Sequence, residues 1–269
     1  MKIRSFAMML LCAGSMVLAD DAPEGGWEVH DSRRPQPPIV TPGEFSTQEK
    51  VGNAPSDAVV LFDGKDLSKW QDGKGGDAPW KVEDGAMVIA PKTGSIQTKD
   101  KFRDVQLHIE WMEPKGIEGK SQGRGNSGVL IMGMYELQVL DSHDNQTYAD
   151  GGAGAIYGQY PPLANPIRPQ GQWQAYDVVF HAPTYDGSKM SKPATITVLF
   201  NSVLVQDHMK LLGPVHHKEL TKYPDSHPEK GPLQLQDHGN PVRFRNIWVR
   251  ELKDKPVAPT KSAGENYKG

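Results

Sequence analysis

Hydrophobic and polar residues alternate in short segments throughout residues 58–252, and this pattern predicts many β-strands. The clearest alternation lies in residues 104–112, where Val105, Leu107, Ile109 and Trp111 share one face and polar residues occupy the other. Because successive side chains of a strand point to opposite faces, we expect a strand with one buried face here. Similar patterns predict strands at 58–62, 80–82, 86–90, 128–132, 135–141, 173–181, 195–200, 203–206, 233–238 and 242–251.

Turn residues separate these segments and predict how the strands are joined. Glu83-Asp84-Gly85 and Asn201-Ser202 each lie between two strand patterns and predict hairpins. The apolar spacing slips at Arg245-Asn246, which predicts a β-bulge. Only residues 210–220 carry a pattern compatible with a short helix. The expected architecture is therefore all-β, with two antiparallel sheets packed face to face as a sandwich or jelly roll.

The two ends of the chain differ in composition from the predicted domain at 58–252. Residues 1–19 have a charged start, an apolar run and small residues before Asp20, as expected for a signal peptide. Cys12, the single cysteine, lies in this segment after Leu11, where a lipoprotein site would have a small residue, so lipidation is disfavoured. Residues 20–57 are rich in proline and predict a linker or extended arm, and 253–269 predict a flexible tail.

Composition excludes several classes of protein. Glycine and proline supply 28 and 22 of the 269 residues, which argues against a helical bundle. The formal net charge of −3 gives no positive field for nucleic acid. After the first segment, no apolar run approaches the ~20 residues that a membrane helix needs. We therefore expect an exported protein with neither a membrane span nor a nucleic-acid partner.

Polar residues inside two predicted strands are the strongest candidates for chemistry. Glu136 and Gln138 share the polar face of one strand, which continues to Asp141 and His143. The other strand has Gln234, Gln236 and His238 on one face, and Asn126 precedes a third strand; His216 and His217 are interpreted as surface residues. Amides, carboxylates and imidazoles suit sugar hydroxyls or one divalent ion, although an ordinary solvent face has similar residues. The nucleophile motif G-x-S-x-G and the zinc motifs H-E-x-x-H and C-x-x-C are absent from the sequence.

Seven short motifs follow one another in the order of a known family. They are Leu61–Trp70 (LFDGKDLSKW), Asn126–Val129 (NSGV), Tyr135–Gln138 (YELQ), Gly154–Tyr157 (GAIY), Trp173, Leu235–Gly239 (LQDHG) and Phe244–Ile247 (FRNI). In these motifs residues 58–252 resemble the 3-keto-disaccharide hydrolase domain family. The resemblance implies a concanavalin-like jelly roll and an exported bacterial protein, periplasmic or secreted, that acts on glycosides oxidised at C3. The polar insertion 115–124 departs from the family pattern beside the site.

The resemblance also suggests roles for the candidate residues. A C3 ketone acidifies the C2 proton, so its removal would allow elimination of the group at C1, followed by addition of water. In this hypothesis His143 or His238 is the base, and Tyr157 protonates the leaving oxygen. Glu136, with Asp141 or His143, would hold one divalent ion such as calcium or manganese. Gln138, Gln236 and Asn126 would orient the ring hydroxyls; His143 cannot be ligand and base in one state.

Two other functions remain open at this stage. A non-catalytic carbohydrate-binding jelly roll would use the same amides, and its histidines would be dispensable. A surface or assembly domain would instead bind a partner through residues 20–57. The sugar, the linkage, the choice between elimination and direct hydrolysis, and the oligomeric state are not defined by the residue pattern.

Overall fold

The computed structural model describes residues 26–252. The predicted signal peptide with Cys12, the start of the predicted arm and the predicted tail at 253–269 lie outside the described residues. The chain divides into two compact units, of which residues 40–252 form the one that contains the strands. The described part of the other unit, residues 26–39, has no helix or strand.

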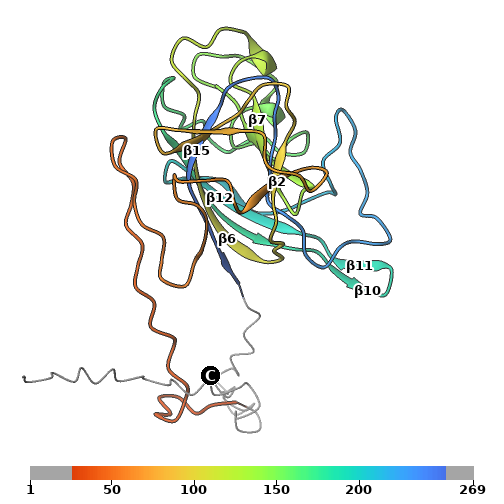
Figure 1. Cartoon of the computed structure of the whole chain (residues 1–269). Coiled ribbons are helices and arrows are strands. Elements are labelled where there is room, and N and C mark those ends of the chain that lie inside the picture. The colour runs from red at the N-terminus through yellow and green to blue at the C-terminus, as the bar shows by residue number, and fades with distance from the viewer. Residues whose placement is uncertain (1–25, 253–269) are drawn as a thin grey trace, which may run out of the picture. The chain divides into compact units, whose positions relative to one another are not determined.

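Eight antiparallel strands form the larger sheet (Figure 1). They are β1 (Val59–Phe62), β3 (Lys81–Glu83), β4 (Ala86–Val88), β6 (Val105–Met112), β9 (Gln174–His181), β12 (Thr195–Phe200), β13 (Val203–Lys210) and β15 (Arg243–Glu251). Their order in the sheet is β13-β12-β9-β6-β15-β4-β3, and β1 also pairs with β15. The long strands β9, β6 and β15 thus form the middle of this sheet.

Five antiparallel strands form the second sheet. In spatial order they are β2 (Trp70–Asp72), β5 (Ile96–Thr98), β14 (Gln234–Leu235), β7 (Ser127–Ile131) and β8 (Tyr135–Val139). A separate hairpin consists of β10 (Thr184–Asp186) and β11 (Lys189–Lys192), and it projects from the sandwich in Figure 1. The helical content of residues 40–252 is limited to the short 3₁₀ turns η2 (Ser121–Gly123) and η3 (Ala149–Gly151).

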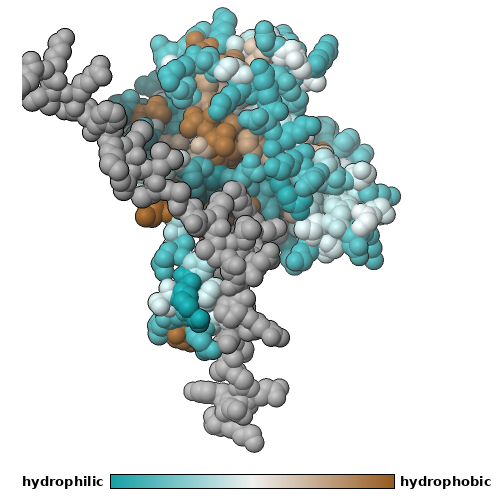
Figure 2. Space-filling view, turned by 60° about the horizontal axis from the view of Figure 1, so that its bottom comes forward, coloured by the Kyte–Doolittle hydropathy of each residue, from teal (hydrophilic) through white to brown (hydrophobic). Residues whose placement is uncertain are grey.

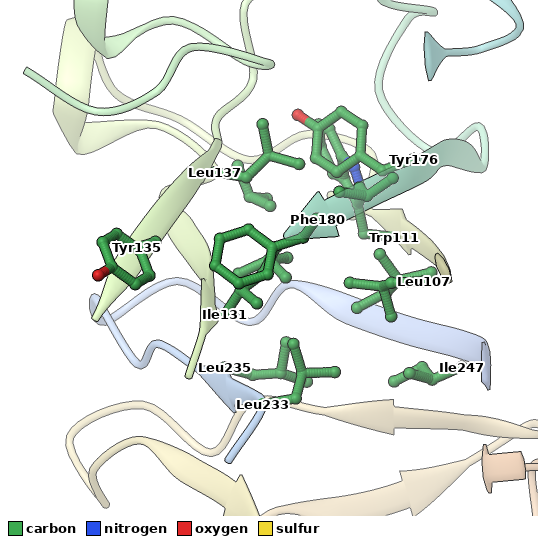
Figure 3. Packing of buried hydrophobic residues seen from close by; sticks show 14 of the residues in the cluster. Leu107, Trp111, Ile131, Tyr135, Leu137, Tyr176, Phe180, Leu233, Leu235 and Ile247 are labelled. Carbon is green, nitrogen blue, oxygen red and sulfur yellow. The ribbon is translucent and has the colours of Figure 1, made fainter. Parts of the chain in front are cut away.

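The core lies between the two sheets, as the alternating pattern predicts. Figure 3 shows Leu137 and Ile131 of the smaller sheet directed toward Phe180 and Leu107 of the larger one. Each of these four side chains is buried, and burial of one such side chain contributes about 1.5–3 kcal/mol. The protein is therefore an all-β, concanavalin-like jelly-roll sandwich of two antiparallel sheets, as predicted.

The predicted hairpin turns are confirmed by their backbone conformation. Asp84 and Gly85 have φ of 52° and 72°, and Asn201 and Ser202 have φ of 50° and 68°. Positive φ at both central residues is the requirement of a type I′ hairpin, whose twist matches that of the flanking strands. The turns therefore fix the pairing of β3 with β4 and of β12 with β13.

The predicted bulge is confirmed, whereas the predicted helix is wrong. The register of β15 against β6 shifts between Arg245 and Trp248, at the position where the apolar spacing slips. Residues 211–220 form turns, and β13 extends to Lys210. Lys210 belongs to β13, and the N–H groups of Leu211, Leu212 and Val215 donate to Ala194, Gln159 and Met134, so the segment is bonded to other parts of the fold and not within itself.

Residues 41–56 have neither helices nor strands, yet they are bonded to the larger sheet. The amide of Gln48 accepts from the N–H of Trp173 at 2.7 Å and donates to its carbonyl at 3.0 Å. Arg245 Nη2 donates to the carbonyl of Thr47 at 2.6 Å. This part of the Pro-rich segment is therefore an arm held against the domain; the boundary at residue 57 stays a prediction.

The face of the described residues that Figure 2 shows is mainly hydrophilic, with a few apolar patches. Within residues 26–252, a helix with the length and apolarity of a membrane span is not found.

Candidate functional site

The outer face of β7 and β8 carries the predicted polar residues. Glu136 and Gln138 point away from the core, because their strand neighbours Tyr135, Leu137 and Val139 are the ones buried within it. On β7, Gly128 pairs with Gln138. The Glu136 carboxylate lies against Gly128, so closely that a β-carbon on this glycine would be 2.4 Å from Oε1.

Glu136 is a buried carboxyl group with few polar neighbours. The residue is 6% exposed, and burial raises the pKa of its carboxyl to about 7. In one orientation of the Gln138 amide, Nε2 lies 3.3 Å from Glu136 Oε1 and 3.1 Å from the Ser127 carbonyl. A carboxyl group with a pKa near 7 is half ionised at neutral pH and can both accept and donate a proton.

Three amide side chains form a hydrogen-bonded group beside Glu136. Asn126 Nδ2 donates to the Gln122 carbonyl at 2.8 Å, and in its other orientation Gln138 Nε2 donates to Gln122 Oε1 at 3.0 Å. Gln236 joins the group through its backbone, because its N–H donates to the Gly128 carbonyl at 3.0 Å. The structure thus brings the predicted residues Asn126, Gln138 and Gln236 together with Glu136.

The loop after β8 brings Tyr157 next to Glu136. Its N–H donates to the Glu136 carbonyl at 3.1 Å, and its hydroxyl lies 2.8 Å from the Tyr148 hydroxyl and 3.5 Å from His217 Nδ1. Burial and the Tyr148 hydroxyl raise the pKa of Tyr157, so the phenol keeps its proton. Tyr148, Asp150, Tyr157 and the segment 216–220 line a pocket of about 380 Å³.

The predicted metal ligands do not form one group. Asp141 is fully buried; its Oδ2 lies 2.6 Å from Arg124 Nε and accepts from Gln170 at 2.7 Å, and its Oδ1 accepts from the His143 N–H. Among residues 26–252, His, Cys, Asp and Glu side chains do not gather in threes as metal ligands. The set Glu136, Asp141 and His143 therefore does not fit a divalent ion in this arrangement.

The two predicted histidine bases lie apart from the hydrogen bonds around Glu136. The His143 side chain is 39% exposed, and its Nδ1 lies 3.3 Å from Asp144 Oδ2. His238 is exposed and lies after β14, which is shorter than the predicted strand. The strand ends early because the Asp237 carboxylate accepts from the N–H groups of Gly94 and Gly239. Their roles as bases stay predictions.

Two polar residues of the polar insertion 115–124 were missed as site residues. Gln122 is the centre of the amide group, and Arg124 neutralises Asp141. Gln122 lies in the 3₁₀ turn η2, and such a short turn has no periodicity that would indicate a direction for its side chain. The only signal in the sequence was the position of the insertion directly before the Asn-Ser-Gly motif.

The outer face of this sandwich has amides beside a buried carboxyl, groups that suit the hydroxyls of a sugar, and comparisons with known proteins support a carbohydrate-active protein. Residues 57–250 match the family described as 3-keto-alpha-glucoside-1,2-lyase-like domain. The match spans well over half of the chain, and the chain belongs to this family.

Individual relatives agree with this assignment. The 3-keto-disaccharide hydrolase of Bacteroides thetaiotaomicron is 26% identical over 240 residues, which cover 72% of this chain and 78% of that protein. A crystal structure of a candidate glycosyl hydrolase from Parabacteroides distasonis is 47% identical, with a TM-score of 0.77; the match covers 81% of this chain and 93% of that chain. A second structure from Parabacteroides distasonis is 22% identical, with a TM-score of 0.53, and the match covers 73% of this chain and 94% of that chain. It shares the fold.

Proposed function

We propose that this protein cleaves the glycosidic bond of glycosides whose sugar is oxidised at C3, with Glu136 as the group that moves the C2 proton. The observation that carries this proposal is the buried Glu136 carboxyl, with its pKa raised to about 7, beside three amide side chains. The family description and the name of the Bacteroides relative supply the 3-keto substrate class. The proposal thus combines a proton-transfer group on this chain with a substrate whose C2 proton is acidic.

The proposed reaction starts with elimination. Ionised Glu136 takes the C2 proton, the electron pair of the C2–H bond forms a C1=C2 double bond conjugated with the C3 ketone, and the C1–O bond breaks. Tyr157 gives its hydroxyl proton to the leaving oxygen. Its raised pKa suits this role, because the phenol stays protonated until the leaving oxygen develops charge. Gln138 and Asn126 orient the ring through its hydroxyls.

Addition of water completes the cycle. After the aglycone leaves, the carboxyl proton of Glu136 exchanges with solvent. The hydroxyl of a water molecule then adds to C1, Glu136 gives a solvent-derived proton to C2, and the second proton of that water restores the Tyr157 phenol. The sum is hydrolysis, with both side chains returned to their starting states. The predicted divalent ion has no part in these steps, because Glu136 acts as the base and Asp141 is paired with Arg124.

The test is aglycone release from an aryl 3-keto-α-glucoside by the full chain in D₂O. We expect release by the wild type, with deuterium at C2 of the product above the level of an enzyme-free control. Glu136→Gln should lower turnover by about 10²–10⁴-fold, a typical range for loss of a general base. Glu229→Gln, an exposed carboxylate, serves as the matched control and should retain turnover.

Other outcomes separate the alternatives. Release without deuterium would overturn elimination in favour of direct hydrolysis, and full turnover by Glu136→Gln together with loss in His143→Ala or His238→Ala would move the base to that histidine. Loss on chelation, restored by a divalent ion, would establish the predicted metal. Sugar binding without any turnover would identify a binding module.

We also propose that the protein is exported after cleavage behind Ala19. The support is the sequence pattern of residues 1–19. N-terminal sequencing of the protein from the periplasm or the culture medium should start at Asp20; recovery of the uncleaved chain in the cytoplasm would contradict this.

A further inference from the structure

A row of residues in register crosses the whole outer face of the smaller sheet. Gln71 of β2 pairs with Gln97 of β5, Gln97 with Gln234 of β14, Gln234 with Leu130 of β7, and Leu130 with Glu136 of β8. Directly paired residues of antiparallel strands point to the same face. The strand neighbours of these glutamines, such as Trp70, Ile96 and Leu235, are buried in the core. Three glutamines on three adjacent strands therefore share the face of Glu136.

These glutamines differ from most other buried or half-buried glutamines of the domain. The side chains of Gln106, Gln122, Gln138, Gln159, Gln170, Gln174 and Gln206 make hydrogen bonds within the protein, whereas those of the half-buried Gln172 and Gln236 make none within residues 26–252. The side-chain amides of Gln71, Gln97 and Gln234 are half-buried and make no hydrogen bond within residues 26–252. Each therefore offers two donors and one acceptor to a ligand.

Leu130, which is 8% exposed, lies between Gln234 and Glu136 in this row, and Gln236 links the glutamines to the proposed point of cleavage. Gln236 follows Gln234 on the same face by the period of two, and its backbone is bonded to Gly128, against which the Glu136 carboxylate lies. Because Gly128 has no side chain, the carboxylate of Glu136 extends over this residue of β7, to which Gln236 is bonded. Adjacent strands are about 5 Å apart, so Gln234 lies about 10 Å, Gln97 about 14 Å and Gln71 about 19 Å from Glu136 across the sheet. This distance exceeds one sugar ring.

We propose that Gln234, Gln97 and Gln71 form an extended subsite for sugar rings on the leaving-group side of the bond cleaved at Glu136. The inference rests on the proposed function for the position of cleavage. It assigns the substrate class as oligosaccharides with at least two sugar rings beyond the oxidised one. The first ring of the leaving group contacts Gln234, and the next one contacts Gln97 and Gln71. Side-chain amides at this spacing bind the hydroxyl groups of uncharged sugars.

The test compares three substrates that share one oxidised ring. They are an aryl 3-keto-α-glucoside and the α-linked gluco-disaccharide and gluco-trisaccharide oxidised at C3 of the non-reducing ring. Gln234→Ala should raise KM at least about 10-fold for the disaccharide and the trisaccharide, and Gln71→Ala for the trisaccharide alone. Turnover of the aryl glycoside should be unchanged in both variants. Ten-fold in KM corresponds to about 1.4 kcal/mol.

Gln106→Ala is the matched control, because Gln106 lies on β6 of the other sheet, and it should leave all three KM values unchanged. Equal effects of Gln71→Ala on all substrates, or none on any, would overturn the subsite. If the wild type turns over none of the substrates, the proposed function fails, and calorimetric titration of the trisaccharide decides the subsite separately. Binding that Gln234→Ala and Gln71→Ala weaken about 10-fold would support it, and binding that is absent or equal in both variants would overturn it.

Discussion

The carboxylate of Glu136 occupies the space that a side chain on Gly128 would fill. A β-carbon on Gly128 would lie 2.4 Å from Oε1 and 3.1 Å from Cγ and Cδ of Glu136. Gly128 has the ordinary backbone of a strand, without the positive φ that favours glycine in turns. The glycine is therefore required by the side chain beside it. It lets a carboxyl group lie flat on the sheet and become buried, which is the origin of the raised Glu136 pKa.

Gly128→Ala should displace the Glu136 carboxylate and lower kcat/KM for the aryl 3-keto-glucoside at least about 10-fold, since small displacements of a catalytic group are costly. Folding should be retained, because the atom displaced is the end of a flexible side chain. Circular dichroism and thermal unfolding check the fold. Gly73→Ala is the control: its β-carbon would meet nothing within 4 Å. Wild-type kinetics in Gly128→Ala would contradict the positioning role.

The pH dependence of turnover should follow the ionisation of Glu136. Burial raises the pKa of its carboxyl to about 7, so the fraction able to accept a proton grows as pH rises through about 7. We expect kcat/KM to fall with unit slope below that pH and to level off above it. A pH–rate profile of the wild type, with the residual rate of Glu136→Gln for comparison, measures this. If kcat/KM of Glu136→Gln still falls with unit slope below about pH 7, the ionising group is a residue other than Glu136.

Period-two alternation was sufficient to predict most of what positions this site. It placed Glu136 and Gln138 on the outward face of one strand and Gln236 on that of another, and the structure has them there. Asn126, named for its place before a strand, lies against Gln138, and Tyr157, named for a role with the resemblance, is bonded to the backbone of Glu136. These predictions succeeded because direction along a strand is a local property, set by the backbone at each residue.

Contacts between distant segments could not be predicted in this way. Asp141 appeared free to bind a metal, but Arg124 pairs with it from the loop before β7. The predicted helix at 210–220 failed for the same reason, because the N–H groups of Leu211, Leu212 and Val215 are bonded to distant segments. Gln71 and Gln97 are single glutamines in short strands, and only the sheet register reveals that they align with Gln234. Tertiary pairing decided each of these cases.

Glu113→Gln should stabilise the protein at neutral pH. Glu113 is fully buried, and both its carboxylate oxygens lack a hydrogen-bond partner within the described chain. Burial, with the nearby charge of Asp141, raises the pKa of the carboxyl to about 8. The folded state therefore holds a proton that the unfolded state releases, so this stability contribution is complete below about pH 4.5 and is lost as pH rises to about 8.

Urea unfolding of the wild type and Glu113→Gln between about pH 5 and 8 measures this effect. The free energy of unfolding of the variant should exceed that of the wild type by an amount that grows with pH, up to about 3 kcal/mol at pH 7. Glu118→Gln, an exposed residue five positions away, should show no such trend. A difference that is constant over the pH range would refute the buried-proton explanation.

Asp177→Asn should lower the free energy of unfolding at low pH but not at high pH, because Asp177 on β9 pairs with His108 on β6. His108 Nδ1 lies 2.7 Å from Asp177 Oδ1, and Nε2 lies 3.2 Å from Glu110 Oε1. Burial lowers the pKa of His108, but the hydrogen bonds to these carboxylates outweigh it and raise the pKa to about 9. A raised histidine pKa stabilises the folded state fully below about pH 6.5, and this contribution disappears as pH rises through about 9.

The Asp177 carboxylate is 40% exposed, so solvent screens its share of this stabilisation, and we expect a loss of about 1 kcal/mol at pH 6 in Asp177→Asn. The loss should approach zero above about pH 9, where His108 is neutral in both proteins. Asp207→Asn, an exposed position on β13, is the control. Turnover should be unchanged in both variants, because His108 and Asp177 lie on the outer face of the larger sheet, away from Glu136. An equal destabilisation at pH 6 and pH 9 would mean that Asp177 acts through packing alone and that the charge of His108 contributes nothing.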